Sequence, residues 1–129
     1  MKLRLYWDED ALKEIAKDCD NKQLKKDVAY GRFLFHHQKQ KLFCEWTDDS
    51  FCIGSLNKNS FLIVGLGTRT KARNKGLASM HLKRVFDAAT RGGVKTIKTR
   101  TRTGTEFYIK RGFEIVGLKG DDYLMEKRL

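Results

Sequence analysis

Hydrophobic residues near the start of the chain recur with the spacing of a helix. Four of them share one helical face: Leu12, Ile15, Ala16 and Cys19. Asp8 or Asp10 is suited to cap the start of this helix, because a short acidic side chain accepts hydrogen bonds from free backbone N–H groups. We expect residues 20–21 to end it. A second amphipathic helix is predicted from about residue 24 to 30, with Gly31 as its end.

Short runs with β-favouring side chains precede these helices and fill the middle of the chain. Groups rich in Gln, Asn, Asp and Ser separate the runs, as turns do. The later turns favour a meander of antiparallel strands, whereas the pairing of the earlier runs stays open. The last run is continuously apolar, which predicts a strand buried on both faces. The runs are residues 3–7, 33–35, 42–46, 51–53 and 61–66.

The remainder of the chain predicts alternating helices and strands. A polar loop over residues 67–75 leads into a helix that begins at Gly76, carries a wide apolar stripe and stops at residues 92–93. A strand over 94–103 and a short helix over 106–110 follow. A hairpin of 113–116 and 123–126 closes the chain. Neither a repeat nor a linker interrupts this order, so we expect one domain over residues 1–129.

Composition narrows the class of protein. Hydrophobic residues make up 40% of the 129 residues, enough for a packed core. No stretch approaches the roughly 20 apolar residues of a membrane span, and the first eight residues lack the apolar core of a signal peptide. The three cysteines lack a metal-binding spacing. We therefore expect a cytoplasmic protein with reduced thiols, no metal and no membrane partner.

Positive charge is concentrated in one segment. The chain has a net charge of +11, and residues 69–111 hold 13 basic and 2 acidic residues, which accounts for the whole excess. Such a concentration predicts an anionic ligand or partner near this segment.

The same segment contains a candidate anion-binding loop. Residues 73–78, Arg-Asn-Lys-Gly-Leu-Ala, fit the pattern R/Q-x-x-G-x-G/A between a buried strand and a helix N-terminus. Backbone N–H groups without partners and the helix dipole favour an anion there, and a glycine lets a phosphate approach the backbone.

Together with a second motif, this loop resembles the GCN5-related N-acetyltransferase (GNAT) superfamily. Residues 108–113, Tyr-Ile-Lys-Arg-Gly-Phe, are similar to the family's Y-x-x-x-G-F motif at the end of its last helix. The resemblance covers residues 61–129, whereas residues 1–60 match only in the order of elements. It implies an α/β (α+β) fold in which about four helices flank a mixed, mostly antiparallel sheet of six or seven strands.

The resemblance also implies roles for particular residues, with acetyl-CoA as donor and no metal. The loop would bind the pyrophosphate, and the end of the preceding strand would pair with pantetheine by strand addition, with a backbone N–H near Thr68 for the oxyanion. Thr101 stands where many members have an Asn that contacts CoA. Tyr108 would be the general acid that protonates the CoA thiolate. The implied cofactor-binding residues are Leu66, Gly67, Thr68, Arg73, Asn74, Lys75, Gly76, Leu77, Ala78 and Thr101.

The general base stays open at this point. The resemblance implies a Glu on the fourth or fifth strand as the frequent base of the family, but residues 61–68, the fourth strand, contain no acid. Glu45 is taken as the candidate catalytic base. The alternatives are Glu106, Asp48 or Asp49 through a water, and His36, His37 or His81, of which His81 is expected on the polar face of its helix.

The acceptor is predicted from charge. Lys98, Arg100 and Arg102 alternate, so they share one face of a strand, and these cations exceed what CoA phosphates need. We therefore expect a polyanion-binding surface and an acceptor amine on or near a nucleic acid, such as aminoacyl-tRNA. The alternatives are a small-amine or protein-lysine acetyltransferase, and a non-catalytic nucleic-acid-binding module of the same fold. The expected state is a monomer or homodimer.

Overall fold

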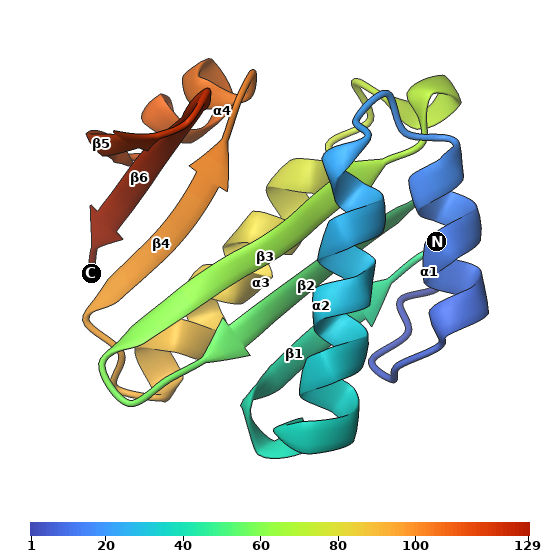
Figure 1. The fold of residues 1–129 in the computed structure, drawn as a ribbon, viewed down its shortest axis with the longest axis horizontal. Helices are drawn as coiled ribbons and strands as arrows, with labels where there is room; N and C mark the ends of the chain where they lie inside the picture. The colour runs from blue at the N-terminus through green and yellow to red at the C-terminus, as the bar shows by residue number, and fades with distance from the viewer.

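The computed structural model describes residues 1–129 as a six-stranded sheet with helices on both faces (Figure 1). The strand order is β1-β2-β3-β4-β6-β5, in which only β3 and β4 pair in parallel. This confirms the predicted mixed, mostly antiparallel sheet with four α-helices. The elements are α1 (Glu9–Lys17), α2 (Gln23–His37), η1 (Lys39–Lys41), β1 (Leu42–Trp46), β2 (Ser50–Leu56), β3 (Ser60–Thr68), η2 (Thr70–Ala72), α3 (Leu77–Arg91), β4 (Thr96–Thr101), α4 (Thr105–Ile109), β5 (Glu114–Lys119) and β6 (Asp122–Arg128).

The N-terminal helices differ from the prediction in one important way. Asp8 caps α1 as expected and accepts a hydrogen bond of 3.1 Å from the Ala11 N–H. Gly31, however, lies inside α2, and residues 33–35 are helical rather than extended. Gly31 is buried where a Cβ would come within 2.8 Å of the Trp7 ring. The glycine is therefore required for packing, and it does not end the helix.

Residues 3–7 do not form the predicted strand. They make a single antiparallel bridge between Arg4 and Trp46, at the end of β1. The side chains of this segment contribute to packing instead. The indole N–H of Trp46 donates to the Tyr6 carbonyl at 2.9 Å, and the Arg4 guanidinium lies over the Trp46 ring.

Two hydrophobic clusters fill the space on the two faces of the sheet. The α1 and α2 side includes Leu12, Val28 and Phe51, and the α3 side includes Phe61, Ile63, Leu82, Val85 and Ile97. In Figure 1, α1 and α2 lie in front of the sheet and α3 lies behind it.

β3 is only partly the doubly buried strand that was predicted. Phe61 and Ile63 are buried, whereas Leu62, Val64 and Leu66 are half-buried and line a cavity. No helix of the structure is long and apolar enough to cross a bilayer.

Candidate active site

The parallel strands β3 and β4 separate towards their carboxyl ends. Their pairing joins Ser60–Ile63 to Thr96–Thr99 and then stops, although both strands continue. At this point the β2–β3 register shifts and leaves Val64 as the extra residue of a bulge, which bends β3. Backbone groups of β3 beyond Ile63 therefore face no neighbouring strand on that side.

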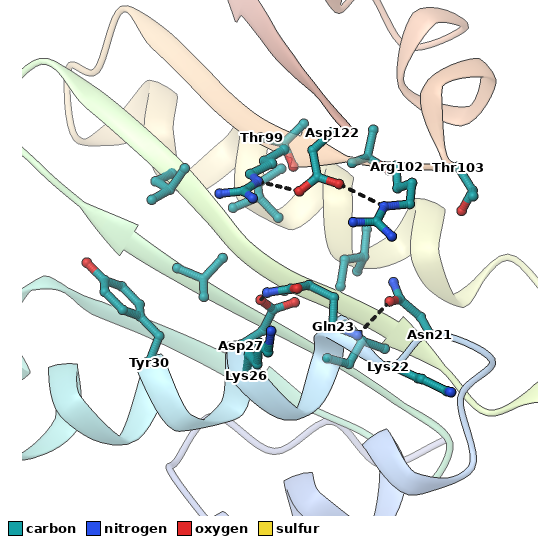
Figure 2. A pocket seen from close by; sticks show the side chains of 18 of the residues that line it. Asn21, Lys22, Gln23, Lys26, Asp27, Tyr30, Thr99, Arg102, Thr103 and Asp122 are labelled. Atoms are coloured by element: carbon teal, nitrogen blue, oxygen red, sulfur yellow. Dashed lines mark hydrogen bonds and ion pairs between the residues drawn. The ribbon is translucent and has the colours of Figure 1, made fainter. Parts of the chain in front are cut away.

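A cavity of about 930 Å³ lies where the two strands separate. Its walls come from the α1–α2 loop, α2, β3, the end of β4 and the β5–β6 turn, as Figure 2 shows for the side chains. Tyr108 also lines it. Of the predicted cofactor-binding residues, Leu66 and Thr101 line this cavity. Its volume is in the range of small-molecule binding sites.

The predicted general acid, Tyr108, lies in this cavity. It comes from α4, is 7% exposed, and packs edge-on against Phe107 and Phe113 at ring-centroid distances of 5.2 and 5.1 Å. Burial raises the pKa of the phenol to about 12, with the Thr99 side chain opposing the shift. The phenol therefore carries its proton throughout the physiological pH range, as a proton donor must.

Thr101 has a local role that its place in the motif did not indicate. Its hydroxyl oxygen accepts a hydrogen bond of 2.9 Å from the Gly104 N–H, just before α4 begins. This bond ties the start of the Tyr108 helix to the end of β4.

Asp27 is an acidic residue in the cavity that the sequence interpretation missed. It lies on α2, against β3 at Gly65, where a Cβ on the glycine would come within 2.8 Å of the Asp27 Cβ. Burial raises the pKa of its carboxyl to about 6, and a hydrogen bond from the Gln23 amide opposes the shift. A carboxyl that titrates near neutral pH is suited to accept and release a proton.

A signal for Asp27 was present in the helical periodicity. Asp27 follows Leu24 by three residues and precedes Gly31 and Leu34 by four and seven, and those three residues are buried. A carboxylate at such a position lies at the edge of a buried stripe, where desolvation shifts its pKa.

Glu45, the predicted base, is placed elsewhere. It is 0% exposed on β1, where Glu45 and His81 are joined by a hydrogen bond of 2.5 Å and the Arg84 Nε donates to the carboxylate at 2.7 Å. The other His81 ring nitrogen bonds the Ser50 hydroxyl at 2.8 Å. His81 is therefore buried and does not lie on the polar face expected for it. Neither residue lines the cavity, so the structure does not bring Glu45 to Tyr108.

The other predicted alternatives also lie outside the cavity. Asp48 pairs with Arg4 at 2.9 Å and Asp49 with Arg69 at 3.7 Å, both at the β1–β2 turn. Glu106 is exposed on α4, and residues 36–37 are exposed at the end of α2.

The candidate phosphate loop has an open, left-handed backbone. Asn74 and Gly76 have φ of 64° and 78°, and a Cβ placed on Gly76 meets no atom within 4 Å. The first hydrogen bond of α3 runs from the Met80 N–H to the Gly76 carbonyl, so the N–H groups of residues 77–79 have no backbone acceptor. The loop does not line the cavity, but it follows the end of β3 that borders it.

The three alternating cations in and directly after β4 have different surroundings. Lys98, Arg100 and Arg102 are all exposed, as alternation predicts. Arg100 and Arg102, however, turn into the cavity and bond the carboxylate of Asp122, whereas Lys98 does not line it.

No group of His, Cys, Asp and Glu is arranged to hold a metal ion. The three cysteines are free, and burial raises the pKa of the Cys19 thiol to about 11.

Comparison with solved structures identifies the fold. The PaiA N-acetyltransferase of Thermoplasma acidophilum in complex with coenzyme A has a TM-score of 0.77 at 15% identity, covering 100% of both chains. The ribosomal-protein-S18-alanine N-acetyltransferase of Escherichia coli has a TM-score of 0.78 at 15% sequence identity. The match covers 98% of this chain and 92% of that chain. Aminoglycoside 6'-acetyltransferase type Ii has a TM-score of 0.75 at 16% sequence identity. The match covers 99% of this chain and 97% of that chain.

This chain therefore has the GNAT fold along its whole length, including residues 1–60, where the sequence matched only in element order. No protein-family model and no curated protein sequence matches the chain. The likeness is one of structure.

Proposed function

We propose that the protein is an N-acetyltransferase that moves the acetyl group of acetyl-CoA to a primary amine by direct attack in a ternary complex. The observation that carries this proposal is that Asp27 and Tyr108 line the same cavity, at the point where β3 and β4 separate. One group titrates near neutral pH and the other stays protonated, which are the properties of a general base and a general acid.

The residues present fit acetyl-CoA, which supplies the activated acetyl thioester. The unpaired edge of β3 over residues 64–68 offers backbone groups to the extended pantetheine chain. The open loop Arg73–Ala78 offers backbone N–H groups, Arg73 and Lys75 to the pyrophosphate. Solved structures of the same fold hold coenzyme A, which supports this assignment.

Asp27 and Tyr108 divide the proton transfers. Asp27 removes a proton from the bound ammonium group, which frees the nitrogen lone pair to form the new N–C bond. Tyr108 donates a proton to the sulfur as the C–S bond breaks, and the phenol is restored by the second nitrogen proton. The net reaction releases one proton to solvent through Asp27. We therefore propose Asp27 in place of Glu45 as the base.

The basic surface supports an acceptor carried on or near a nucleic acid. Lys98 and Arg100 are exposed on one face of β4, Arg102 directly follows that strand, and the cation excess lies within residues 69–111. In this form of the proposal the amine-bearing end enters the cavity between α2 and β4, while Lys98 contacts a phosphate outside it. Asp27 favours an enzyme over a non-catalytic binding module, because it supplies the base that the sequence alone lacked.

Calorimetry with acetyl-CoA tests the donor site. Gly76→Asp places a carboxylate where the pyrophosphate should lie and should abolish measurable binding. Gly93→Asp is a matched control, since Gly93 has φ of 72°, lies past the other end of α3 and also has open space around it. The two variants carry the same charge change and similar backbone strain. Equal binding of acetyl-CoA by both variants would show that the loop is not the donor site.

A further inference from the structure

Two arginines in the cavity are held side by side by one carboxylate. The Nε groups of Arg100 and Arg102 donate to the two oxygens of Asp122 at 2.5 and 3.2 Å. The Asp122 side chain is only 10% exposed, and the hydrogen bond from Arg100 holds its pKa below the ordinary value. Figure 2 shows the Asp122 carboxylate joined to the Arg102 guanidinium by a dashed line. Asp122 is thus a buried, ionised anchor that fixes both arginines at the cavity wall.

Most of the hydrogen-bonding capacity of these arginines is unused. Each guanidinium has five N–H donors, and Asp122 takes only the one on Nε. No other hydrogen bond of either side chain is present in the structure. The Arg100 and Arg102 side chains are 47% and 65% exposed. Two oriented guanidinium ends therefore face the cavity, in the arrangement that binds phosphate or carboxylate in pairs of parallel bonds.

The other charged residues of the cavity also favour an anionic ligand. Lys22, Lys26 and Lys119 also line it, and the acids besides Asp122 are Asp20 and Asp27. Cations thus outnumber acids by five to three. A polycationic acceptor, such as a polyamine or an aminoglycoside, would be repelled by this wall, whereas an acceptor with an acidic group would be attracted.

The arginine pair and the candidate base belong to one site. Asp27, Arg100 and Asp122 line the same cavity, where Arg100 lowers and Asp122 raises the pKa of Asp27 by smaller amounts than burial does. An amine positioned at Asp27 therefore has the guanidinium ends nearby on the opposite wall, across from α2.

We propose that the acceptor is an amine that also bears a phosphate or carboxylate, which Arg100 and Arg102 bind while Asp27 takes the ammonium proton. This proposal rests on the acetyltransferase function proposed above. The anionic group belongs either to a small molecule or to the backbone of a nucleic acid that carries the amine.

Three small primary amines that differ in the charge of their second group test whether the site prefers an anionic acceptor. O-phosphoethanolamine, ethanolamine and ethylenediamine carry an anionic, a neutral and a cationic second group. We expect kcat/KM to be about tenfold or more higher for O-phosphoethanolamine than for ethanolamine, since hydrogen bonds to a charged group are the stronger class. Ethylenediamine should be the poorest acceptor. Turnover is followed as release of the CoA thiol, with mass spectrometry of the acetylated amine.

Arg102→Gln tests the arginine directly. It should raise KM for O-phosphoethanolamine about tenfold, and its effect on the KM for ethanolamine should be several-fold smaller, because ethanolamine has no anionic group for the arginine to bind. Arg128→Gln is the matched control, an exposed arginine on β6 that does not line the cavity.

A second experiment uses an RNA with a free aminoacyl amine as the acceptor. If only that RNA is acetylated, with the same dependence on Arg102, the bound anion is a backbone phosphate.

The outcomes also separate this proposal from the function it rests on. Equal kcat/KM for the three amines, a preference for ethylenediamine, or an Arg102→Gln effect of the same size on all of them overturns the anionic acceptor but leaves the acetyltransferase intact. Absence of acetyl-CoA binding in calorimetry, or of any amine-dependent CoA release, overturns the function itself.

Discussion

Asp27→Asn should inactivate the protein and stabilise it at the same time. The substitution removes the proposed base but keeps the size of the side chain and an oxygen that can accept the Gln23 hydrogen bond. Loss of a general base typically lowers kcat about 10²–10⁴-fold. Burial raises the pKa of the native carboxyl from 3.8 to about 6, so its ionisation at neutral pH lowers the stability of the folded state. An amide does not ionise, so Asn removes this destabilisation.

The magnitude and its pH dependence follow from the two pKa values. Below about pH 3 the carboxyl is neutral in both folded and unfolded chains, and it costs nothing. As pH rises from about 3 to 6 the unfolded chain loses this proton before the folded one does, so native stability falls. Above pH 6 the cost levels off at no more than about 3 kcal/mol, since each unit of pKa is worth about 1.4 kcal/mol.

Urea unfolding of the parent and the variant at pH 7.5 and pH 4 measures this cost. Asp27→Asn should be more stable than the parent by about 1–3 kcal/mol at pH 7.5, and the difference should shrink to about half a kcal/mol or less at pH 4. Asp87→Asn, the same change at an exposed position of α3, should show neither effect. A variant that is less stable than the parent at pH 7.5, or equally stable at both pH values, would refute the desolvated carboxyl.

Three further outcomes are expected. The kcat of acetyl transfer should rise with pH through about 6, as Asp27 loses its proton, and should show no alkaline decline from Tyr108 below about pH 11; a flat profile would exclude Asp27 as base. Glu45→Gln should lower the free energy of unfolding by about 1–3 kcal/mol in urea, because it weakens the hydrogen bond to the buried His81 ring, and an unchanged stability would contradict the role given to this network. If a nucleic acid is bound, replacing three cations by Gln should flatten the plot of log K against log salt by roughly two, at 0.7–0.9 for each phosphate contact, and an unchanged slope would remove these cations from that interface. They are Lys98, Arg100 and Arg102.

Local patterns were enough to predict the second half of the molecule. The glycines that bound α3 and the alternation in β4 act over a few residues, so the loop, the helix and the exposed face of Lys98 and Arg100 were readable. The same is true of Tyr108, whose motif places it on the short helix before Gly112.

Features that depend on distant contacts were not readable. Gly31 was predicted to end a helix because glycine often does, but its role is to admit the Trp7 ring. The raised pKa of Asp27 requires Gly65, which is 38 positions away in the chain and lets α2 approach β3. Asp122 likewise meets Arg100 and Arg102 only because β6 pairs with β4.

Release of CoA from acetyl-CoA in the presence and absence of an amine tests the central claim most directly. The parent should release CoA in proportion to acetylated amine, with O-phosphoethanolamine as the first acceptor to try. Tyr108→Phe should bind acetyl-CoA like the parent in calorimetry and release CoA about 10²–10⁴-fold more slowly. Unchanged turnover by Tyr108→Phe, or a parent that binds acetyl-CoA but releases no CoA with any amine, would contradict an acetyltransferase that works through Tyr108 and Asp27.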